Sequence, residues 1–402
     1  MSTRRIVAAT LAGHFAAAFA ALGMPPFYDR ILRQALGNDA SWLAGWLFVM
    51  PTLVAALSNP WWGRLADRYG KKRLLLRAHL GLAASFWLTS LAGNVWQFAA
   101  ALLLQGLLGG TFAASNAYLA TVVSGHRLAR LLTLMQGSAR AALFAGPALM
   151  GVVSHGAEPL LLYRYLALLP FMAALLVWRL PAGAQPMHAG QGRQASDGGD
   201  GNALGGEAIA PGHLYGLQFA FIFATVITFP YFVPYAEQTL ARLPAAAPGL
   251  LFGLPHLVYL LCALPLSRLC GRRHLLATLA ASQLVLIVAL LGQAGSHSLA
   301  TLAAWRFVMG VAMTACYIAL HGMVAAITDA GNAGRRFGSL EGSTKWGAVA
   351  AGLAAGVAAA RWGLQAHFLI GAAALAASCI HLVVLLFRRS RGDFKQPAHS
   401  SD

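Results

Sequence analysis

The chain consists of long apolar segments that alternate with short clusters of charged residues. Most segments run for about 20 residues, the length of helix that crosses the hydrocarbon core of a bilayer. A helix bonds all of its backbone groups internally, so it is stable in lipid. Twelve such segments begin near Ile6, Trp42, Leu74, Trp96, Leu128, Leu160, His213, Ala247, Leu275, Leu299, Phe337 and Leu364. The pattern predicts an all-α membrane protein with twelve transmembrane helices.

A polar stretch divides these segments into two groups of six. Residues 181–212 are rich in Gly, Gln, Asp and Ser, a composition that buries too little apolar surface to fold. We therefore expect an N-terminal six-helix bundle at 1–180 and a flexible cytoplasmic linker at 181–212. A C-terminal six-helix bundle at 213–388 and a cytoplasmic tail at 389–402 follow.

The two groups are related in sequence. Pro51 and Gly106 in the first group match Pro255 and Gly310 in the second, both at an offset of 204 residues. Offsets near half the chain length indicate a duplicated six-helix unit. Two parallel repeats that handle a substrate between them are typical of transporters. The sequence therefore predicts two pseudo-symmetric bundles.

The composition excludes a soluble protein and a nucleic-acid-binding protein. Apolar residues make up 58% of the 402 positions and charged residues only 10%, whereas soluble domains carry about a quarter charged residues. The net charge is +17, but most of the 29 Lys and Arg lie on the side that a cytoplasmic N-terminus makes cytoplasmic. This positive-inside distribution predicts a multi-pass protein of the bacterial inner membrane, in contact with lipid, with both termini in the cytoplasm.

The loop after the second segment carries the most specific motif. It contains Gly63, Asp67, Arg68, Gly70 and Lys71 in close succession. An ordinary positive-inside loop accounts for the basic residues but not for an acid between two glycines. The loop resembles, in sequence and position, the signature loop of the major facilitator superfamily. The resemblance covers nearly the whole chain, and it implies that this loop latches the two bundles and opens during the conformational cycle.

A second motif lies in the fifth segment, where Gly146 and Pro147 are adjacent. It resembles the Gly-Pro motif of family members that work as antiporters, although Ala142 and Met150 stand where glycines are usual. Proline removes a backbone hydrogen bond and glycine permits close approach of helices. The resemblance favours export over import, whereas the structural alternative is a generic kink.

Charged residues within the segments are the most informative for function. Arg140 and Lys345 end the related segments QGSAR (136–140) and EGSTK (341–345), which places one cation on each wall of a central cavity. Glu341 precedes Lys345 by four residues, so the two can pair along one helix face. That pairing alone would make them structural, but it leaves Arg140 unexplained, because its neighbour one turn earlier is Gln136.

Charges inside a membrane usually face a cavity, a partner or an ion pathway. Two cations around one acid favour an anionic substrate, and Glu341 is the candidate proton carrier. The resemblance implies a further coupling residue in the fourth segment, where this chain has Leu102. Arg306 occupies the equivalent position in the tenth segment, so we consider both a proton-coupling role and extension to the outer interface. His14 is a third candidate for proton coupling.

Other polar residues lie at membrane depth, mostly on segments that line the cavity in this superfamily. They are His14, Asn116, Tyr118, Gln218, His256, Tyr317 and His321. The candidate substrate contacts are Arg140, Lys345, Gln136, Asn116, Tyr118, Gln218 and His321. Taken singly, each neutral residue is better explained as a packing group than as a ligand.

The resemblance is strongest to the bacterial branch of multidrug and siderophore exporters. We therefore expect a monomeric, proton-coupled exporter of a small anionic metabolite such as a siderophore. The alternatives are a multidrug efflux pump, uptake of an organic anion or sugar, and a transporter-like sensor. The sequence contains no Walker-type phosphate loop, no His-Glu-x-x-His and no Cys-x-x-Cys pattern. We accordingly expect neither enzymatic activity nor a bound cofactor or metal.

Overall fold

The computed structural model describes residues 2–154, 158–182, 209–240, 243–270, 274–327 and 333–390. All regular elements in these ranges are helices. The predicted linker lies mostly outside the described residues, and so does the tail beyond residue 390.

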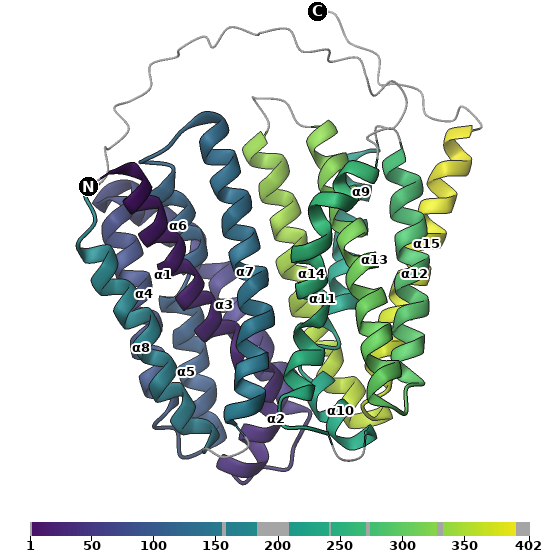
Figure 1. The fold of residues 1–402 in the computed structure, drawn as a ribbon, viewed down its shortest axis with the longest axis horizontal. Helices are drawn as coiled ribbons and strands as arrows, with labels where there is room; N and C mark the ends of the chain where they lie inside the picture. Colours follow the sequence, from purple (N-terminus) through teal and green to yellow (C-terminus); the bar gives the residue numbers. More distant parts are fainter. Residues whose placement is uncertain are drawn as a thin grey trace, which may run out of the picture.

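The first bundle contains the helices of the N-terminal repeat (Figure 1). Its elements are α1 (Thr3–Gly23), η1 (Pro25–Phe27), α2 (Tyr28–Arg30), η2 (Ile31–Ala35), α3 (Leu43–Tyr69), α4 (Lys71–Thr89), α5 (Val95–Leu108), α6 (Thr111–Leu119), α7 (Gly125–Val153) and α8 (Pro159–Trp178). The fourth predicted span is divided into α5 and α6, because Gly110 adopts a left-handed backbone conformation (φ 82°) that ends the first helix.

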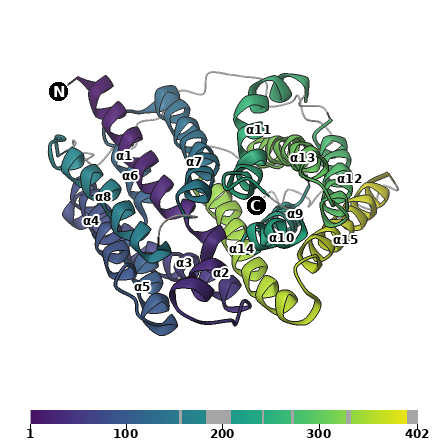
Figure 2. The same cartoon turned by 60° about the horizontal axis from the view of Figure 1, so that its bottom comes forward.

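The second bundle repeats this arrangement. Its elements are α9 (Pro211–Val226), α10 (Phe232–Thr239), α11 (Ala247–Leu269), α12 (Leu275–Ala294), α13 (Leu299–Ala326), α14 (Ala333–Trp362) and α15 (Ala366–Ser390). Figure 2 shows the two bundles side by side, with α3 and α7 of the first next to α14 and α11 of the second. The predicted fold of two six-helix bundles is therefore confirmed.

Eight helical segments in the described part of the chain are long and apolar enough to cross a membrane. The helices α4, α7, α9 and α14 fall outside this set, although they pack within the same bundles. Helix α9 has only 16 residues, and the other three carry charged residues within or at the start of the helix. Membrane helices that carry polar groups depend on neighbouring helices to shield them.

The predicted repeat has a direct counterpart in helix packing. A side-chain Cβ at Gly106 would lie 2.9 Å from the Cα of Pro51, and one at Gly310 would lie 2.9 Å from the Cα of Pro255. The missing side chain thus permits the same close approach of two helices in each bundle.

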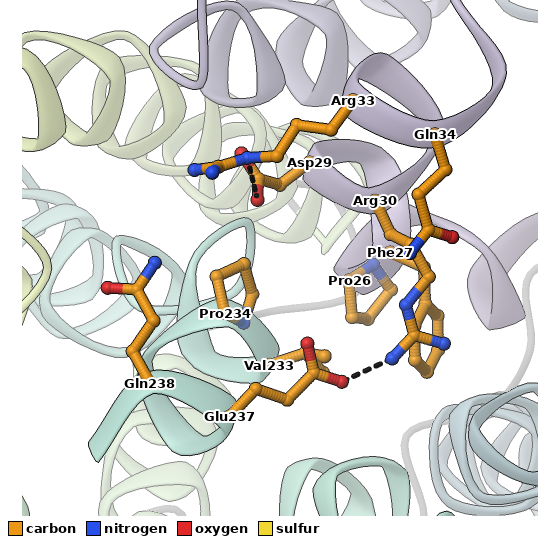
Figure 3. A pocket seen from close by; sticks show the side chains of 10 residues that line it. All are labelled: Pro26, Phe27, Asp29, Arg30, Arg33, Gln34, Val233, Pro234, Glu237 and Gln238. Atoms are coloured by element: carbon orange, nitrogen blue, oxygen red, sulfur yellow. Dashed lines mark hydrogen bonds and ion pairs between the residues drawn. The ribbon is translucent and has the colours of Figure 1, made fainter. Parts of the chain in front are cut away.

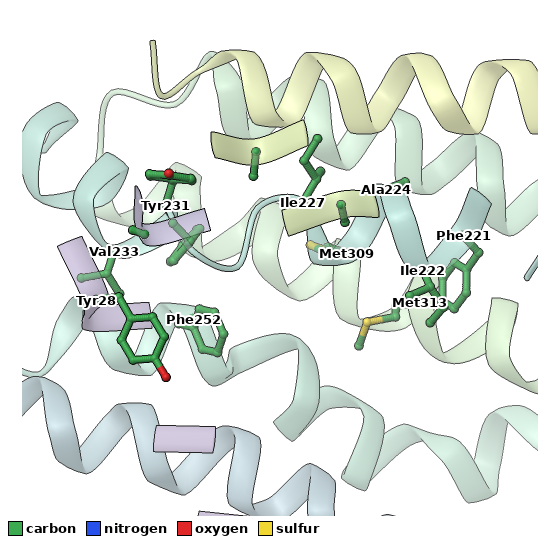
Figure 4. Close-up of a cluster of buried hydrophobic side chains, with 14 of the residues drawn as sticks. Tyr28, Phe221, Ile222, Ala224, Ile227, Tyr231, Val233, Phe252, Met309 and Met313 are labelled. Atoms are coloured by element: carbon green, nitrogen blue, oxygen red, sulfur yellow. The ribbon is translucent and has the colours of Figure 1, made fainter. Parts of the chain in front are cut away.

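We call the end of the molecule at which α1 begins and α15 ends the terminal end. The opposite end, which carries η1, α2, η2 and α10, is the loop end (Figure 1). Buried apolar side chains of both bundles form one continuous cluster. Figure 4 shows part of it, with Tyr28 of the first bundle close to Val233 and Phe252 of the second. Continuous apolar packing therefore joins the bundles at the loop end.

Two pairs of helices approach closely across the bundle interface. A Cβ at Gly45 of α3 would lie 2.6 Å from the carbonyl oxygen of Gly352 of α14. A Cβ at Gly253 of α11 would lie 2.8 Å from the Cα of Phe144 of α7. Both contacts involve the parts of α7 and α14 nearer the loop end. Glycine is required in such contacts because helix backbones approach one another directly.

The terminal-end parts of α7 and α14 show no such approach. A Cβ at Gly137 of α7, or at Gly338 or Gly342 of α14, would have no atom within 4 Å. Among the described residues, the two bundles are thus joined near the loop end and separate toward the terminal end. Arg140 and Lys345 lie between the open glycines and the packed ones on their helices.

Candidate substrate site between the bundles

The best-defined polar site lies around Arg140, in the middle of α7. Its Nη1 lies 3.3 Å from Nδ1 of His256 on α11. Its Cζ lies 4.4 Å from the ring centroid of Tyr317 on α13 and 5.0 Å from that of Tyr259 on α11. A first-bundle cation therefore contacts three rings of the second bundle. We call these four residues, together with His321, the central site.

Helical spacing positions the rings of the central site. His256 and Tyr259 are three residues apart on α11, and Tyr317 and His321 are four apart on α13, so each pair shares one helix face. The Tyr259 and Tyr317 rings meet edge to face at 5.9 Å, and Tyr317 stacks on His321 at 5.8 Å. His321 is exposed, whereas His256 is buried. The site thus has a closed side at His256 and an open side at His321.

The central site and its surroundings carry excess positive charge. Lys345 is half-buried on α14, and Glu341 is exposed one turn earlier on the same helix. No ion pair joins Glu341 to Lys345. Within the described ranges, no carboxylate oxygen lies within 4 Å of a side-chain nitrogen of Arg140 or Lys345. The pairing that the four-residue spacing allowed is therefore not formed in this conformation. Gln136, also on α7, is exposed.

The other predicted contacts are distributed over both bundles. Gln218 of α9 is buried and donates to the Thr344 hydroxyl at 2.9 Å, directly beside Lys345. Tyr118 of α6 donates to the carbonyl of Pro181 at 2.9 Å and packs within the first bundle. Asn116 is half-buried on α6.

His14 of α1 is buried in the first bundle, with its ring 5.0 Å from that of Phe112. Neither His14 nor Tyr118 belongs to the group of rings around Arg140. The structure thus brings together Arg140 and His321 from the predicted set, and it places Gln218 next to Lys345.

Arg306 does not extend to the outer interface, because only 1% of its surface is exposed. Its Nε donates to the carbonyl of Leu251 at 2.9 Å, and Nη2 donates to the carbonyl of Phe252. Its Cζ lies 4.1 Å from the Phe232 ring centroid. These contacts hold α13 against α11 and α10 inside the second bundle.

The signature loop lies at the terminal end, between α3 and α4. Asp67 pairs with Lys71 of the same loop, and the described ion pairs include none from Asp67 to the second bundle. Gly70 ends α3 with a φ of 97°, which a residue with a side chain rarely adopts. Arg68 lies over the ring of Tyr69 at 5.5 Å, and Gly63 has open space around it.

The Gly146-Pro147 motif lies where α7 meets two other helices. A Cβ at Gly146 would lie 2.9 Å from the Cα of Gly23 on α1, and one at Gly249 of α11 would collide with the carbonyl of Pro147. The motif is therefore packed both within the first bundle and across the bundle interface.

Contacts at the loop end were missed by sequence reasoning. Figure 3 shows Arg30 of the first bundle paired with Glu237 of the second, with Asp29 and Arg33 nearby. The Tyr231 hydroxyl accepts a hydrogen bond from the Gly45 amide at 3.0 Å and lies 2.8 Å from the Ser41 carbonyl, to which it donates. The sequence held one sign of this contact: Arg30 and Glu237 have opposite charges, and each lies just after the first span of its repeat.

The arrangement of helices agrees with sequence comparison. The family profile described as Major Facilitator Superfamily matches residues 10–205 and 214–402. The chain belongs to the Major Facilitator Superfamily. As a member, it is a multi-pass membrane transporter and not an enzyme.

Among curated proteins, this facilitator is similar to the multidrug resistance protein MdtG. It is 39% identical to MdtG of Enterobacter lignolyticus (strain SCF1) over 137 residues, which cover 33% of this chain and 32% of that protein. It is 37% identical to MdtG of Salmonella paratyphi B over 137 residues, 33% of this chain and 34% of the other. The chain thus matches about a third of the length of these relatives.

Solved structures show the same fold. The human organic anion transporter MFSD10 aligns with a TM-score of 0.66 at 18% identity, over 95% of this chain and 100% of that one. The nucleoside transporter NupG aligns with a TM-score of 0.71 at 13% identity, over 95% and 98%. A POT family transporter aligns with a TM-score of 0.73 at 13% identity, over 96% of each chain. At these identities the likeness concerns the fold alone.

Proposed function

We propose that this facilitator exports a small anionic molecule from the cytoplasm in exchange for protons. The observation that carries the proposal is the half-buried Arg140, which reaches from the first bundle to the second with no carboxylate of the described residues within ion-pairing distance. Charges at membrane depth are costly and mark substrate or ion pathways. Lys345 supplies a second cation at the equivalent position of the other repeat. A bound anion would offset both charges.

The terminal end is the cytoplasmic end in this proposal. Most Lys and Arg residues fall at the terminal end, as the positive-inside rule requires of the cytoplasmic side. The separation of α7 and α14 toward the terminal end then gives the central site access from the cytoplasm. A substrate made in the cell would enter between these helices and meet Arg140, Lys345, Gln136 and Gln218.

The direction of transport rests on the Gly-Pro motif and on the relatives. Pro147 lies in the contact of α7 with α11, and Gly146 beside it packs against α1. The α7–α11 contact must rearrange if the loop end opens. The relatives are named as multidrug resistance proteins, which favours efflux. Glu341, the acid nearest to Lys345 along α14, is the proposed proton carrier, and the loop around Asp67 and Lys71 is the proposed cytoplasmic latch.

Anionic metabolites with several carboxylates, such as siderophores, match this charge best. A multidrug pump is the second candidate, supported by the similarity to MdtG and by the ring faces of Tyr259 and Tyr317, which suit planar organic cations. The purified protein in proteoliposomes distinguishes the two. We expect a citrate-type carboxylate siderophore to be carried against an imposed proton gradient, and a cationic dye to be carried poorly.

Cells provide the test of direction. Cells without the protein should retain the exported anion, and an uncoupler should abolish export from cells that have it. Accumulation of the anion by overproducing cells would show uptake instead. Binding of the anion by purified protein without any flux in either direction would show a sensor.

A further inference from the structure

His256 is a buried imidazole at the interface between the bundles. Only 1% of its surface is exposed, and it directly follows Pro255 on α11. Its Nδ1 receives the Arg140 guanidinium of the other bundle at 3.3 Å. A guanidinium has hydrogen-bond donors only. Nδ1 must therefore present its lone pair, and His256 is neutral with its hydrogen on Nε2 whenever Arg140 is docked.

The Arg140–His256 contact differs in depth from the polar contacts at the loop end. Arg140 lies at mid-helix on α7, whereas Tyr231 and the Arg30–Glu237 pair join the bundles at the loop end. The Arg140–His256 contact lies at the boundary between the packed part of the bundle interface and the part that is open toward the terminal end. Breaking this contact would remove a polar interaction that stabilises the conformation open at the terminal end.

The groups that face His256 make its protonated form incompatible with docked Arg140. Arg140 approaches from α7 and Arg306 from α13, and both act on His256 electrostatically. The rings of Phe229, 5.9 Å away, and of Phe252, 6.4 Å away on α11 itself, also lie near His256. In the described part of the chain, no carboxylate pairs with either arginine. A proton on His256 would create a third positive charge beside two guanidiniums in a region of low dielectric.

We propose that His256 is a proton-binding site that competes with the docking of Arg140. The proton binds Nδ1 only after the guanidinium N–H has turned away, and Arg140 returns only after that proton has left. This proposal rests on the proposed function, because it requires Arg140 to be the group that the substrate anion binds. Both a proton on His256 and an anion on Arg140 then break the same contact between the bundles.

The competition makes the bundle contact sensitive both to the anion and to pH. In the conformation open to the cytoplasm, an anion draws Arg140 away from His256 and releases the bundle contact. A proton on His256 releases the same contact, so both favour the conformation that is closed at the terminal end. Transfer of protons across the membrane remains the role proposed for Glu341.

The test measures conformation in the substrate-free protein. Spin labels at Leu134→Cys on α7 and Gly338→Cys on α14, with the native cysteines replaced by alanine, report the opening of the terminal end by pulsed electron resonance. Both positions are exposed. Acidification from about pH 8 to about pH 5.5, across the range in which imidazoles titrate, should reduce the open population several-fold.

The variant His256→Gln should abolish this acid response, because its amide cannot be protonated in that range. The matched control is His297→Gln, which removes an exposed histidine of the same bundle and should retain the response. Arg140→Gln should also abolish it, since a protonated His256 then has no docked cation from the other bundle. An undiminished acid response in His256→Gln, or in Arg140→Gln if the first variant does not fold, would overturn the proposal.

The two proposals fail differently. The spin-label experiment contains no substrate, so its result does not depend on what the protein transports. If the wild-type protein exports no anion in proteoliposomes, only the proposed function is contradicted. Anion export whose pH dependence is unchanged in His256→Gln would contradict the role of His256 and leave the proposed function intact.

Discussion

Arg306 replaces the hydrogen bond that Pro255 removes. In a regular helix the carbonyl of Leu251 would accept from the amide of residue 255, but proline has no amide hydrogen. The Nε of Arg306 donates to that carbonyl at 2.9 Å. A fully buried cation therefore braces the proline-containing part of α11, and these contacts account for its position.

Removing this brace should destabilise the second bundle. Arg306→Leu leaves the Leu251 carbonyl buried without its donor, and we expect a loss of about 1.5–3 kcal/mol, the contribution of a hydrogen bond to a charged group. Thermal unfolding of the purified protein measures it. The double variant with Pro255→Ala should recover part of the loss, because alanine at this position restores the backbone amide. Additive losses in the two variants would show that the residues are not linked.

Neutralising either Arg140 or Lys345 should weaken substrate binding. For Arg140→Gln or Lys345→Gln we expect the dissociation constant for the anion to rise about tenfold or more, since a charge-assisted hydrogen bond contributes about 1.5–3 kcal/mol. Arg140→Lys should restore affinity only partly, because lysine lacks the planar fork. Titration calorimetry measures these values. The control is Arg361→Gln, which removes an exposed cation at the loop end of α14. An equal loss of affinity in this variant would point to a general effect of charge.

Asp67→Asn should impair transport without preventing membrane insertion. Among the described residues, Asp67 pairs only within its own loop, so the change should alter little in this state. It should instead destabilise the conformation that is closed at the terminal end, in which we expect the loop to contact the second bundle. Export assays with protein levels checked in isolated membranes provide the measurement. Full export by a well-expressed variant would mean that the loop is a charged tether.

A methyl group at the α7–α11 contact should disfavour the conformation that is open at the terminal end. A Cβ at Gly249 would overlap the Pro147 carbonyl, so Gly249→Ala should separate the bundles near the loop end. We expect lower thermal stability and greater labelling of cysteines introduced at that end. Gly137→Ala is the matched control, because it adds the same methyl to α7 in open space. Equal labelling of both variants would contradict the proposed role of this contact.

Reporter fusions test the orientation of the whole molecule. Fusions after Arg73 and after Ser390 both lie at the terminal end and should report the cytoplasm. A fusion at Asp39, between η2 and α3 at the loop end, should report the opposite side. A cytoplasmic signal from Asp39 would reverse the assignment of the two ends and with it the direction of transport.

The sequence was sufficient for the fold, because eight segments are long and apolar enough to define a span and each of the remaining four has a counterpart at the matching place in the other repeat. It was also sufficient for the repeat, since Pro51 with Gly106 and Pro255 with Gly310 make the same helix contact. Charge at membrane depth singled out Arg140.

The sequence placed His256 and Tyr317 at membrane depth, but it did not predict that they contact Arg140. His256 and Tyr259 belong to the other bundle, and which helices face each other across the interface depends on tertiary packing and on conformation. Glu341 and Lys345 show the limit of spacing arguments: a four-residue spacing permits contact, but it does not require contact where the helix borders open space.

The helices α7 and α14 are not apolar enough to be counted among the membrane-spanning segments. Each carries a central cation, Arg140 or Lys345, and such a residue adds about 2.5–3.5 kcal/mol to the insertion of an isolated helix by the translocon. Each is followed closely along the chain by a strongly apolar helix, α8 or α15. During biosynthesis, α7 and α14 must therefore remain beside the translocon until the next helix emerges from the ribosome and enters the lipid with them.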